Sequence, residues 1–390
     1  MTFIHAVTLQ DAGGASRVEE YERQFAELAG GGYALSFTYA RTALVAILRA
    51  AGLRPGDEVL LSPLTCKVVP LAVLAGGFRP VYVDIDSGTL NLDPARAATA
   101  LTPRTRAVLF QRTYGLAGGA SEAMAFARAR DLCFVEDSAQ CMPSPGSWCG
   151  DVAVFSANGG KPLSAGSGGV AVFRDPALAR AVAELRGALP VAPLGSAVRA
   201  RIDAWVRNRL LTPRLYWPAL ELARRASASY RPRPIPEEIA SEVTAPSARL
   251  HPLHAAGGLH AVAGAAQVAR HRAASCVWYA SALGECSTLA STSPAGEGLY
   301  YFPVMVRRKQ DLLREASRRG VEIVPWPVTT PIYPVTDVEQ LGRYGYVSGT
   351  CPVAEEVAAG LVGLPTDPRV SGKERERAVA LVREFLRGDE

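Results

Sequence analysis

The sequence lacks the cysteine and histidine patterns that mark disulfide frameworks and metal sites. Its seven cysteines are scattered over 390 residues and include no Cys-x-x-Cys pair. A secreted disulfide-stapled fold and a structural zinc module are therefore disfavoured, and a reducing compartment, the cytoplasm, is the expected location. Among the five histidines, His251, His254 and His260 lie close together, but Pro252 intervenes and no carboxylate or cysteine lies nearby. We expect them at a helix start or an interface, and no metal site.

Long apolar runs are also missing. The most apolar stretch, VLLSPLTCKVVPLAVLAGG, is interrupted by Lys67 and two prolines, so no membrane span is predicted. The first residues, MTFIHAVTLQDAGG, have neither a basic nor an apolar segment of the signal-peptide kind, and we expect no signal peptide. The formal net charge of +5 is too small to indicate nucleic-acid binding, although it suits anionic small substrates.

What is present is a pattern of short apolar runs that alternate with helical segments. Residues 1–32 read as an N-terminal arm with one amphipathic helix that ends at the glycines 30–32. From residue 33 to about 175, six predicted strands are bounded by Gly, Pro and Asp: EVLLS, RPVYVDI, RAVLFQ, LCFVED, VAVFS and GVAVFRD. Continuous apolar strands separated by helices indicate a sheet that is buried on both faces, hence an α/β fold with mostly parallel strands.

The rest of the chain divides into a basic helical region and a smaller domain. We assign residues 33–246 to a large domain, of which 176–246 form a linker region of helices. Between Arg180 and Arg233 this region holds eleven arginines and three acidic residues. Two interpretations remain open, namely helices packed on the core with solvated arginines, or a surface for an anionic membrane, a carrier protein or a nucleotide-linked substrate. The pattern of residues 247–390 predicts a small α+β domain, with strands at LYYFPVMV and VEIVPW.

Two segments contain side chains that could take part in catalysis or ligand binding, FVEDSAQ and VFSANGGKPLSAGSGGVAVF. Asp137 and Lys161 both follow predicted strands, and open α/β sheets collect ligand-binding groups at that edge. A lysine in a glycine-dense loop can be partly desolvated, which lowers the pKa of its amine and favours imine formation. Ser156 could donate its hydroxyl to a phosphate. Each residue also has an ordinary interpretation, because a lone aspartate often caps a helix and a lone loop lysine is usually solvated.

These motifs and several others occur in an order that resembles the sugar aminotransferases of the DegT/DnrJ/StrS family, which are fold type I enzymes dependent on pyridoxal 5'-phosphate (PLP). The resemblance covers nearly the whole chain. It rests on YARTALVAIL, LRPGDEVLLSPLT, RPVYVDIDSGTLNLDPARAATALTPRTRAVL, QRTYGLAGG, FVEDSAQ, GDVAVFSANGGKPLSAGSGG, ARLHPLHAAGG and CPVAEEVAAGLVGLPTDP. The order and spacing of these segments, rather than any one of them, carry the resemblance.

The resemblance implies a role for each matching residue of the sheet edge. Lys161 would form the Schiff base with PLP and shuttle the proton. Asp137 would pair with the pyridinium nitrogen and so preserve the ring as an electron sink. Gln140 would hydrogen-bond the phenolic oxygen of the cofactor. Ser156 would bind the phosphate.

Other positions implied by the resemblance are less usual for the family. The backbone amides of Ala40 and Arg41, where a helix begins, would complete the phosphate site. The Arg41 guanidinium would either add charge to that site or face solvent. Ser247 stands where the family brings an asparagine from the neighbouring subunit to the phosphate. Cys66 replaces the aromatic residue that normally stacks on the pyridine ring.

Three further residues are candidates for the substrate side of the pocket. Arg112 replaces a histidine or aromatic residue, and it would either bind a carboxylate or phosphate of the substrate or form an ion pair at an interface. Arg249 lies near Ser247 at the expected subunit boundary. Trp326 falls in a loop of the small domain that would face the substrate, or it packs in the core.

The resemblance implies an aminotransferase that works as a homodimer. It would move an amino group from glutamate or glutamine to a keto-sugar, nucleotide-linked in the usual case, or to a keto-cyclitol, in cell-surface or secondary-metabolite biosynthesis. Two alternatives remain open. One is a PLP-dependent sugar dehydratase or lyase, in which relatives carry histidine in place of the lysine. The other is a catalytically silent member of the fold with a regulatory role.

Overall fold

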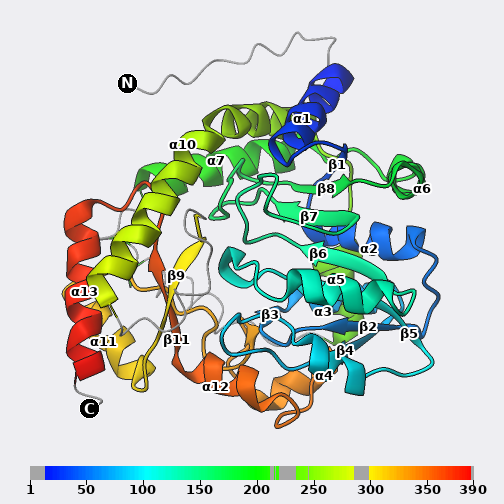
Figure 1. Ribbon diagram of the computed structural model, residues 1–390. Helices are drawn as coiled ribbons and strands as arrows, with labels where there is room; N and C mark the ends of the chain where they lie inside the picture. Colours follow the sequence, from blue (N-terminus) through cyan, green and yellow to red (C-terminus); the bar gives the residue numbers. More distant parts are fainter. Residues whose placement is uncertain are drawn as a thin grey trace.

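The computed structural model describes residues 14–210, 215, 217–218, 234–244, 246–284 and 298–387. Figure 1 shows a large α/β part built on a central sheet and a smaller part beside it, near the C-terminus. Among the described residues, no helix combines the length and apolar content that crossing a bilayer requires. The parts of the basic region at 211–214, 216 and 219–233 lie outside the described residues.

The central sheet has seven strands in the order β1-β8-β7-β6-β5-β2-β4. They are β1 (Tyr33–Phe37), β2 (Glu58–Leu61), β4 (Arg79–Tyr82), β5 (Thr105–Gln111), β6 (Cys133–Asp137), β7 (Val152–Ser156) and β8 (Gly169–Phe173). Strands β4, β2, β5, β6 and β7 run parallel, whereas β8 is antiparallel to β7 and β1 to β8. The mostly parallel sheet and the six predicted strands are confirmed. The seventh strand, β1, directly follows three glycines and was not predicted.

Helices cover both faces of the sheet. They are α1 (Gly14–Leu28), α2 (Ala40–Ala50), α3 (Val68–Ala75), α4 (Pro94–Thr99), α5 (Ala120–Arg128), α6 (Pro176–Gly187), α7 (Leu194–Leu210) and α9 (Ile235–Ile239), with short turns η1 (Thr113–Gly115) and η2 (Ala240–Thr244). On β2, Val59 and Leu61 pack towards α2 and α3, while Leu60 packs towards α4 and α5. Successive strand residues point to opposite faces, so this run is apolar throughout, as a doubly covered sheet requires.

The smaller part is built on a two-stranded antiparallel sheet of β9 (Tyr301–Met305) and β11 (Leu361–Pro365). Its helices are α10 (Pro252–Leu283), α11 (Lys309–Arg319), α12 (Pro352–Gly360) and α13 (Gly372–Arg387), with a further turn η5 (Val338–Tyr344). The predicted strand VEIVPW is wrong, since Val324 makes only an isolated bridge, to Gly363. Pro325 and Pro327 lack the N–H groups that a longer ladder needs.

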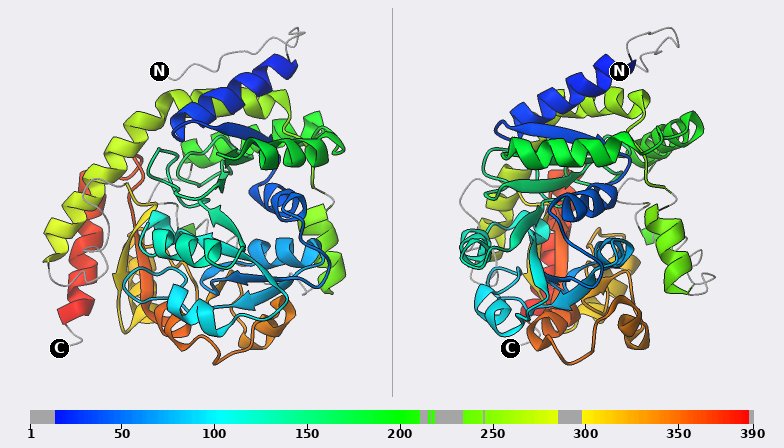
Figure 2. Two further views of the ribbon diagram at one scale, coloured as in Figure 1. Left: turned by 45° about the vertical axis from the view of Figure 1, so that its right-hand side comes forward. Right: turned by 90° about the vertical axis from the view of Figure 1, so that its right-hand side faces the viewer.

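The long helix α10 connects the two parts. Its first half packs with α1 and the central sheet through Ala255 and Ala265, and its last turns pack with β9 through Tyr279 and Leu283. Figure 2 shows α10 running from α1 to the region of α13. The helix therefore belongs to both parts, and the domain limits at residues 32 and 246 stay a prediction. His251 caps the start of α10 by accepting a hydrogen bond from Leu253 N, which confirms the helix-start interpretation.

A second small sheet brings part of the C-terminal region to the large part. Strand β10 (Ile332–Tyr333) pairs in parallel with β3 (Thr65–Cys66), so that Tyr333 lies opposite Cys66. This pairing places the loop that follows Trp326 beside the carboxyl edge of the central sheet.

Candidate cofactor site at the carboxyl edge of the sheet

The two candidate residues Asp137 and Lys161 come together at one edge of the sheet. Asp137 is the last residue of β6, and Lys161 lies in the loop between β7 and β8. Burial raises the pKa of Asp137, against the opposing effects of the Ala139 N–H and of the charge on Lys161. The loop of Lys161 is tightly turned, since its N–H donates to Asn158 O at 3.1 Å and Ala165 N donates to Ala157 O at 2.9 Å. The backbone thus holds the lysine in a tight loop near the half-buried carboxyl group of Asp137.

Cys66 lies within the electrostatic reach of both residues. Burial raises the pKa of its thiol, while Lys161 lowers it and Asp137 raises it. The side chain that stands in place of an aromatic ring stacker therefore does line the same space as the aspartate–lysine pair. Nothing in the sequence around Cys66 alone identifies this position.

Two tyrosines that the sequence analysis missed stand beside the pair. Lys161 Nζ lies 5.7 Å from the centroid of the Tyr300 ring, and the Tyr300 hydroxyl donates to Gly160 O at 2.6 Å. Tyr333 is half-buried; burial raises the pKa of its phenol, and the charges of Cys66 and Tyr300 raise it further. Both tyrosines are more than a hundred residues from Lys161 in the sequence, and no local signal identifies them. Aromatic surface in this pocket is thus supplied by the small part of the molecule.

The start of α2 approaches the same edge closely. Tyr39 precedes the helix in extended conformation and its side chain does not cap the first turn. A Cβ atom on Gly169 would lie 2.1 Å from Ala40 N, so only glycine at the start of β8 permits this approach. Ser156 pairs with Gly169 across the β7–β8 ladder. The hydroxyl of Ser156 and the first N–H groups of α2 are therefore neighbours, as an anion site at a helix N-terminus requires.

Arg41 and Ser247 occupy positions in this neighbourhood that the sequence did not show. The Arg41 side chain donates through Nε to Glu242 O and stacks on the Tyr39 ring, with Cζ 4.0 Å from the centroid. It is half-buried, and a contribution of its charge to the phosphate site stays a prediction. Ser247 donates to Val243 O at 2.6 Å, and its Oγ lies 3.3 Å from Thr42 Oγ1. Within one chain, Ser247 already stands beside the first turn of α2.

Gln140 is buried, and its side chain already makes one hydrogen bond within the chain. Its Oε1 accepts a hydrogen bond from Tyr114 N at 2.8 Å. That contact fixes the side chain and turns its NH2 group into the donor suited to a phenolic oxygen. The η1 turn that carries Tyr114 links this residue to Trp326, because the Tyr114 hydroxyl donates to Trp326 O.

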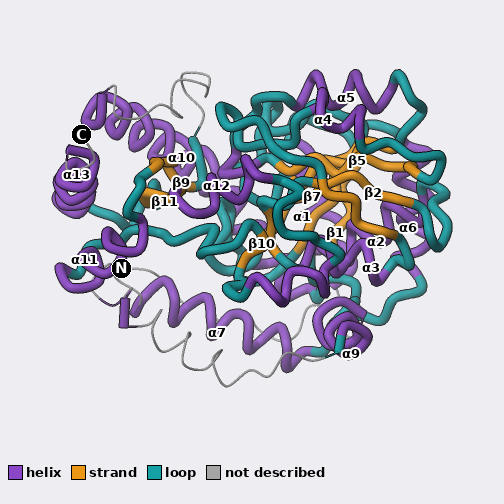
Figure 3. The backbone as a smooth tube through the Cα atoms, turned by 90° about the horizontal axis from the view of Figure 1, so that it is seen from below, coloured by secondary structure: helices purple, strands orange, loops and turns teal. Residues whose placement is uncertain are grey.

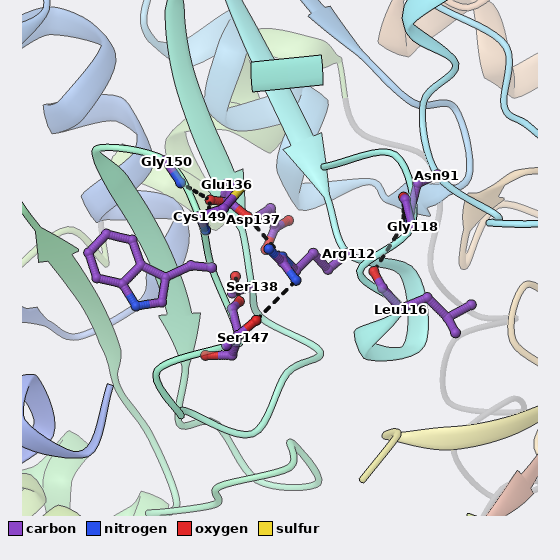
Figure 4. Close-up of polar contacts among 12 residues, drawn as sticks. Asn91, Arg112, Leu116, Gly118, Glu136, Asp137, Ser138, Ser147, Cys149 and Gly150 are labelled. Atoms are coloured by element: carbon purple, nitrogen blue, oxygen red, sulfur yellow. Dashed lines mark hydrogen bonds and ion pairs between the residues drawn. The ribbon is translucent and has the colours of Figure 1, made fainter. Parts of the chain in front are cut away.

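Arg112 is held in a buried ion pair within the chain, which neither expectation for it included. Its side chain is 3% exposed, and Nε donates to Glu136 Oε2 at 2.8 Å. The other oxygen of Glu136 accepts from Cys149 N at 2.7 Å and Gly150 N at 2.6 Å, a network visible in Figure 4. The carboxylate partner of Arg112 lies within the same chain on the neighbouring strand, and a role of Arg112 towards a substrate or a second subunit stays a prediction.

The two other substrate candidates differ in their placement. Trp326 is half-buried, and its ring centroid lies 5.4 Å from that of Tyr114 and 6.4 Å from that of Tyr333. It therefore belongs to the aromatic group beside Cys66. Arg249 forms isolated backbone bridges with Phe37 and Val191, and its side chain is exposed. A role for Arg249 at a substrate or subunit boundary stays a prediction.

Solved structures share this architecture over nearly the whole chain. The structure of DesV from S. venezuelae in complex with a ketimine intermediate is 26% identical, with a TM-score of 0.70, and the match covers 95% of this chain and 89% of that one. A DegT DnrJ EryC1 StrS aminotransferase from Brucella abortus is 20% identical, with a TM-score of 0.70 over 95% of this chain and 90% of that one. The second likeness shows the fold alone.

Curated relatives match over different lengths. Protein MosB of Rhizobium meliloti is 36% identical over 44% of this chain and 35% of its own length. GDP-perosamine synthase of Caulobacter vibrioides is 35% identical over 44% of this chain and 47% of its own length. The chain therefore spans less than half the length of either of these two relatives. UDP-N-acetyl-3-dehydro-alpha-D-glucosamine 3-aminotransferase of Acidithiobacillus ferrooxidans is 27% identical over 94% of this chain and 88% of its own.

The sequence model of one family accounts for most of the chain. It matches residues 10–189 and 226–383 and leaves out the segment between them, in which α7 lies. Together with the shared architecture and the residues assembled at the sheet edge, this match shows that the chain belongs to the DegT/DnrJ/EryC1/StrS aminotransferase family.

Proposed function

We propose that the chain is a PLP-dependent aminotransferase that transfers an amino group from glutamate or glutamine to a keto-sugar or keto-cyclitol. The observation that carries the proposal is the meeting of Lys161 with the half-buried carboxyl of Asp137 at the carboxyl edge of the sheet. The relatives named above include aminotransferases of nucleotide-linked sugars, which supports the substrate class.

The residues of the edge fit the chemical groups of PLP. Ser156 and the N-terminus of α2, held close by Gly169, suit a phosphate. Asp137 suits a protonated pyridine nitrogen, and Gln140 offers an NH2 group to a phenolic oxygen. Lys161 supplies the primary amine to which an aldehyde can be joined.

PLP, when bound, supplies an electron sink that stabilises negative charge at a carbon that loses a proton. The chain itself has three tasks in this reaction. Asp137 would keep the ring nitrogen of the cofactor protonated, and its half-buried position would strengthen that interaction. Lys161 holds the cofactor at rest, and its Nζ accepts and returns the substrate proton. The ring of Tyr300 borders Nζ, and the hydroxyl of Tyr300 fixes Gly160, the residue before the lysine.

The dehydratase and the silent-member alternatives are less well supported. Lys161 is present where dehydratase relatives carry histidine, and the aspartate–lysine pair that a silent member would lose is intact. A homodimer is also part of the proposal, and light scattering of the purified protein tests it.

A half-reaction separates these functions. Purified protein loaded with PLP is mixed with glutamate or glutamine in the absence of a keto substrate, and the products are followed by absorbance and mass spectrometry. The proposal expects pyridoxamine phosphate and one keto acid in equal amounts. PLP binding without this conversion from either donor would contradict the aminotransferase assignment.

A further inference from the structure

Helix α7 presents apolar side chains to solvent along its whole described length. Leu194, Val198, Ile202 and Val206 are 49%, 42%, 55% and 37% exposed. Because they are spaced by four residues, they follow one another along one side of the helix. Figure 3 shows α7 along one side of the molecule, at the margin of the body. These four residues are called the outer stripe below.

The outer stripe is not needed to hold the helix in place. On another side, Ala197 is fully buried, and α7 packs against α10. Arg201 also donates to Leu253 O of α10 at 3.3 Å. The helix is thus attached through its alanine side, while the larger aliphatic side chains of the outer stripe keep a large share of their surface in solvent.

Basic side chains of α7 flank the outer stripe. Arg199 and Arg201 are exposed, and α7 contains four arginines and one acidic residue, Asp203. An apolar stripe with basic flanks is the composition of helices that lie in the interface of an anionic membrane.

The family comparison separates this feature from the cofactor site. The sequence model of the family matches up to residue 189 and resumes at residue 226, so α7 lies outside the part of the chain that this model matches. A further binding function of this segment is therefore compatible with an unchanged active site.

We propose that α7 binds the surface of a membrane that contains anionic phospholipid. Leu194, Val198, Ile202 and Val206 enter the boundary between head groups and acyl chains, and the arginines contact the phosphates. Charge favours this occupant over a second copy of the chain. A two-fold contact places the same patch on both partners, which brings the arginines of the two copies together. Anionic head groups instead complement them.

Vesicle co-sedimentation of the full-length, PLP-loaded protein tests the proposal. Vesicles of phosphatidylcholine alone are compared with vesicles that also contain phosphatidylglycerol, at low and high salt. The variant Val198→Gln/Ile202→Gln removes apolar surface and keeps good helix formers. The matched control is Val338→Gln/Val347→Gln, which changes two equally exposed valines elsewhere. Expected are binding to the anionic vesicles only, weakening by salt, and at least about tenfold weaker binding of the α7 variant but not of the control.

Three results would overturn the proposal: no binding to anionic vesicles, equal binding to neutral ones, or equal weakening by both double variants. Light scattering without lipid adds a fourth. If the α7 variant dissociates an oligomer that the wild type forms, the outer stripe is a contact between copies. The rate of the half-reaction with glutamate is measured in parallel, and it is expected to be unchanged, so the test is independent of the proposed enzyme function.

Discussion

The carboxyl edge of the sheet and helix α7 depart from the usual distribution of side chains in opposite directions. The edge encloses ionisable groups, since the Arg112–Glu136 pair is buried and Asp137 is half-buried, whereas α7 exposes large aliphatic side chains. Buried polar groups and exposed apolar stripes are both costly unless something binds there or pairs with them. The difference between the two regions fits the two proposals: the edge binds a small anionic cofactor, and α7 binds the surface of a membrane.

The largest expected effect falls on Lys161. Lys161→Ala removes the amine that holds PLP and moves the proton, so the rate of the half-reaction with glutamate should fall by about 10⁴-fold or more. Stopped-flow absorbance of wild type and variant measures it. Lys161→Arg is the control that keeps the positive charge beside Asp137 and is expected to be as inactive. A variant Lys161→Ala that retains wild-type rate would break the account of the edge.

The next largest effect concerns Arg112 and distinguishes a charge that stabilises the fold from one that binds the substrate. Arg112→Met leaves Glu136 buried without its ion-pair partner, which should lower the free energy of unfolding by about 3 kcal/mol. Urea denaturation monitored by circular dichroism measures the change. Arg128→Met is the control, since Arg128 pairs with Asp151 at the surface and should lose well under 1 kcal/mol. Unchanged stability of Arg112→Met, together with a raised KM for the keto substrate, would restore the substrate role for Arg112.

A third prediction applies the comparison to single isoleucines. Ile47 of α2 is fully buried, whereas Ile202 of α7 is more than half exposed. Ile47→Ala should destabilise the protein by about 2–5 kcal/mol, because it removes packed methylene groups and leaves a cavity. Ile202→Ala should change stability by less than about 0.5 kcal/mol. Denaturation of the two variants side by side measures both; a large loss for Ile202→Ala would show that the outer stripe is part of the core.

The smallest expected effect is a pH dependence in the small part of the molecule. Burial raises the pKa of Glu322 to about 7. Between its ordinary value of 4.5 and about 7, the folded protein keeps a proton that the unfolded chain has lost. Stability therefore falls as the pH rises through this window. Denaturation at several pH values should show a shallower decline in Glu322→Gln than in wild type. Parallel pH profiles of the two proteins would contradict the assignment.

Much of the edge could be predicted from the sequence because its groups lie at the ends of recognisable strands. Asp137 and Lys161 sit in short motifs, and the carboxyl ends of parallel strands must meet at one edge. The long helices α10 and α13 were likewise predicted from their continuous helical pattern. These features depend on short motifs and on local residue patterns, which can be identified in the sequence without knowledge of distant contacts.

Other parts of the site depend on contacts between distant segments. The partner of Arg112 lies 24 residues away on the neighbouring strand, and only the pairing of β5 with β6 brings the two together. Tyr300 and Tyr333 reach the pocket through β9 and through the pairing of β10 with β3. For α7, both the alanine side and the outer stripe are apolar. Which side faces the body is decided by packing on α10, which no periodicity in the sequence reveals.

The most direct test of the central claim is chemical trapping of the cofactor on the purified chain. Protein incubated with PLP is reduced with borohydride, digested and analysed by mass spectrometry, and Lys161→Ala is treated in parallel. The account predicts one modified peptide, FSANGGKPLS, with the cofactor on Lys161 and no such peptide from the variant. Absence of bound PLP in the wild type, or stable modification at another lysine in its place, would contradict the account.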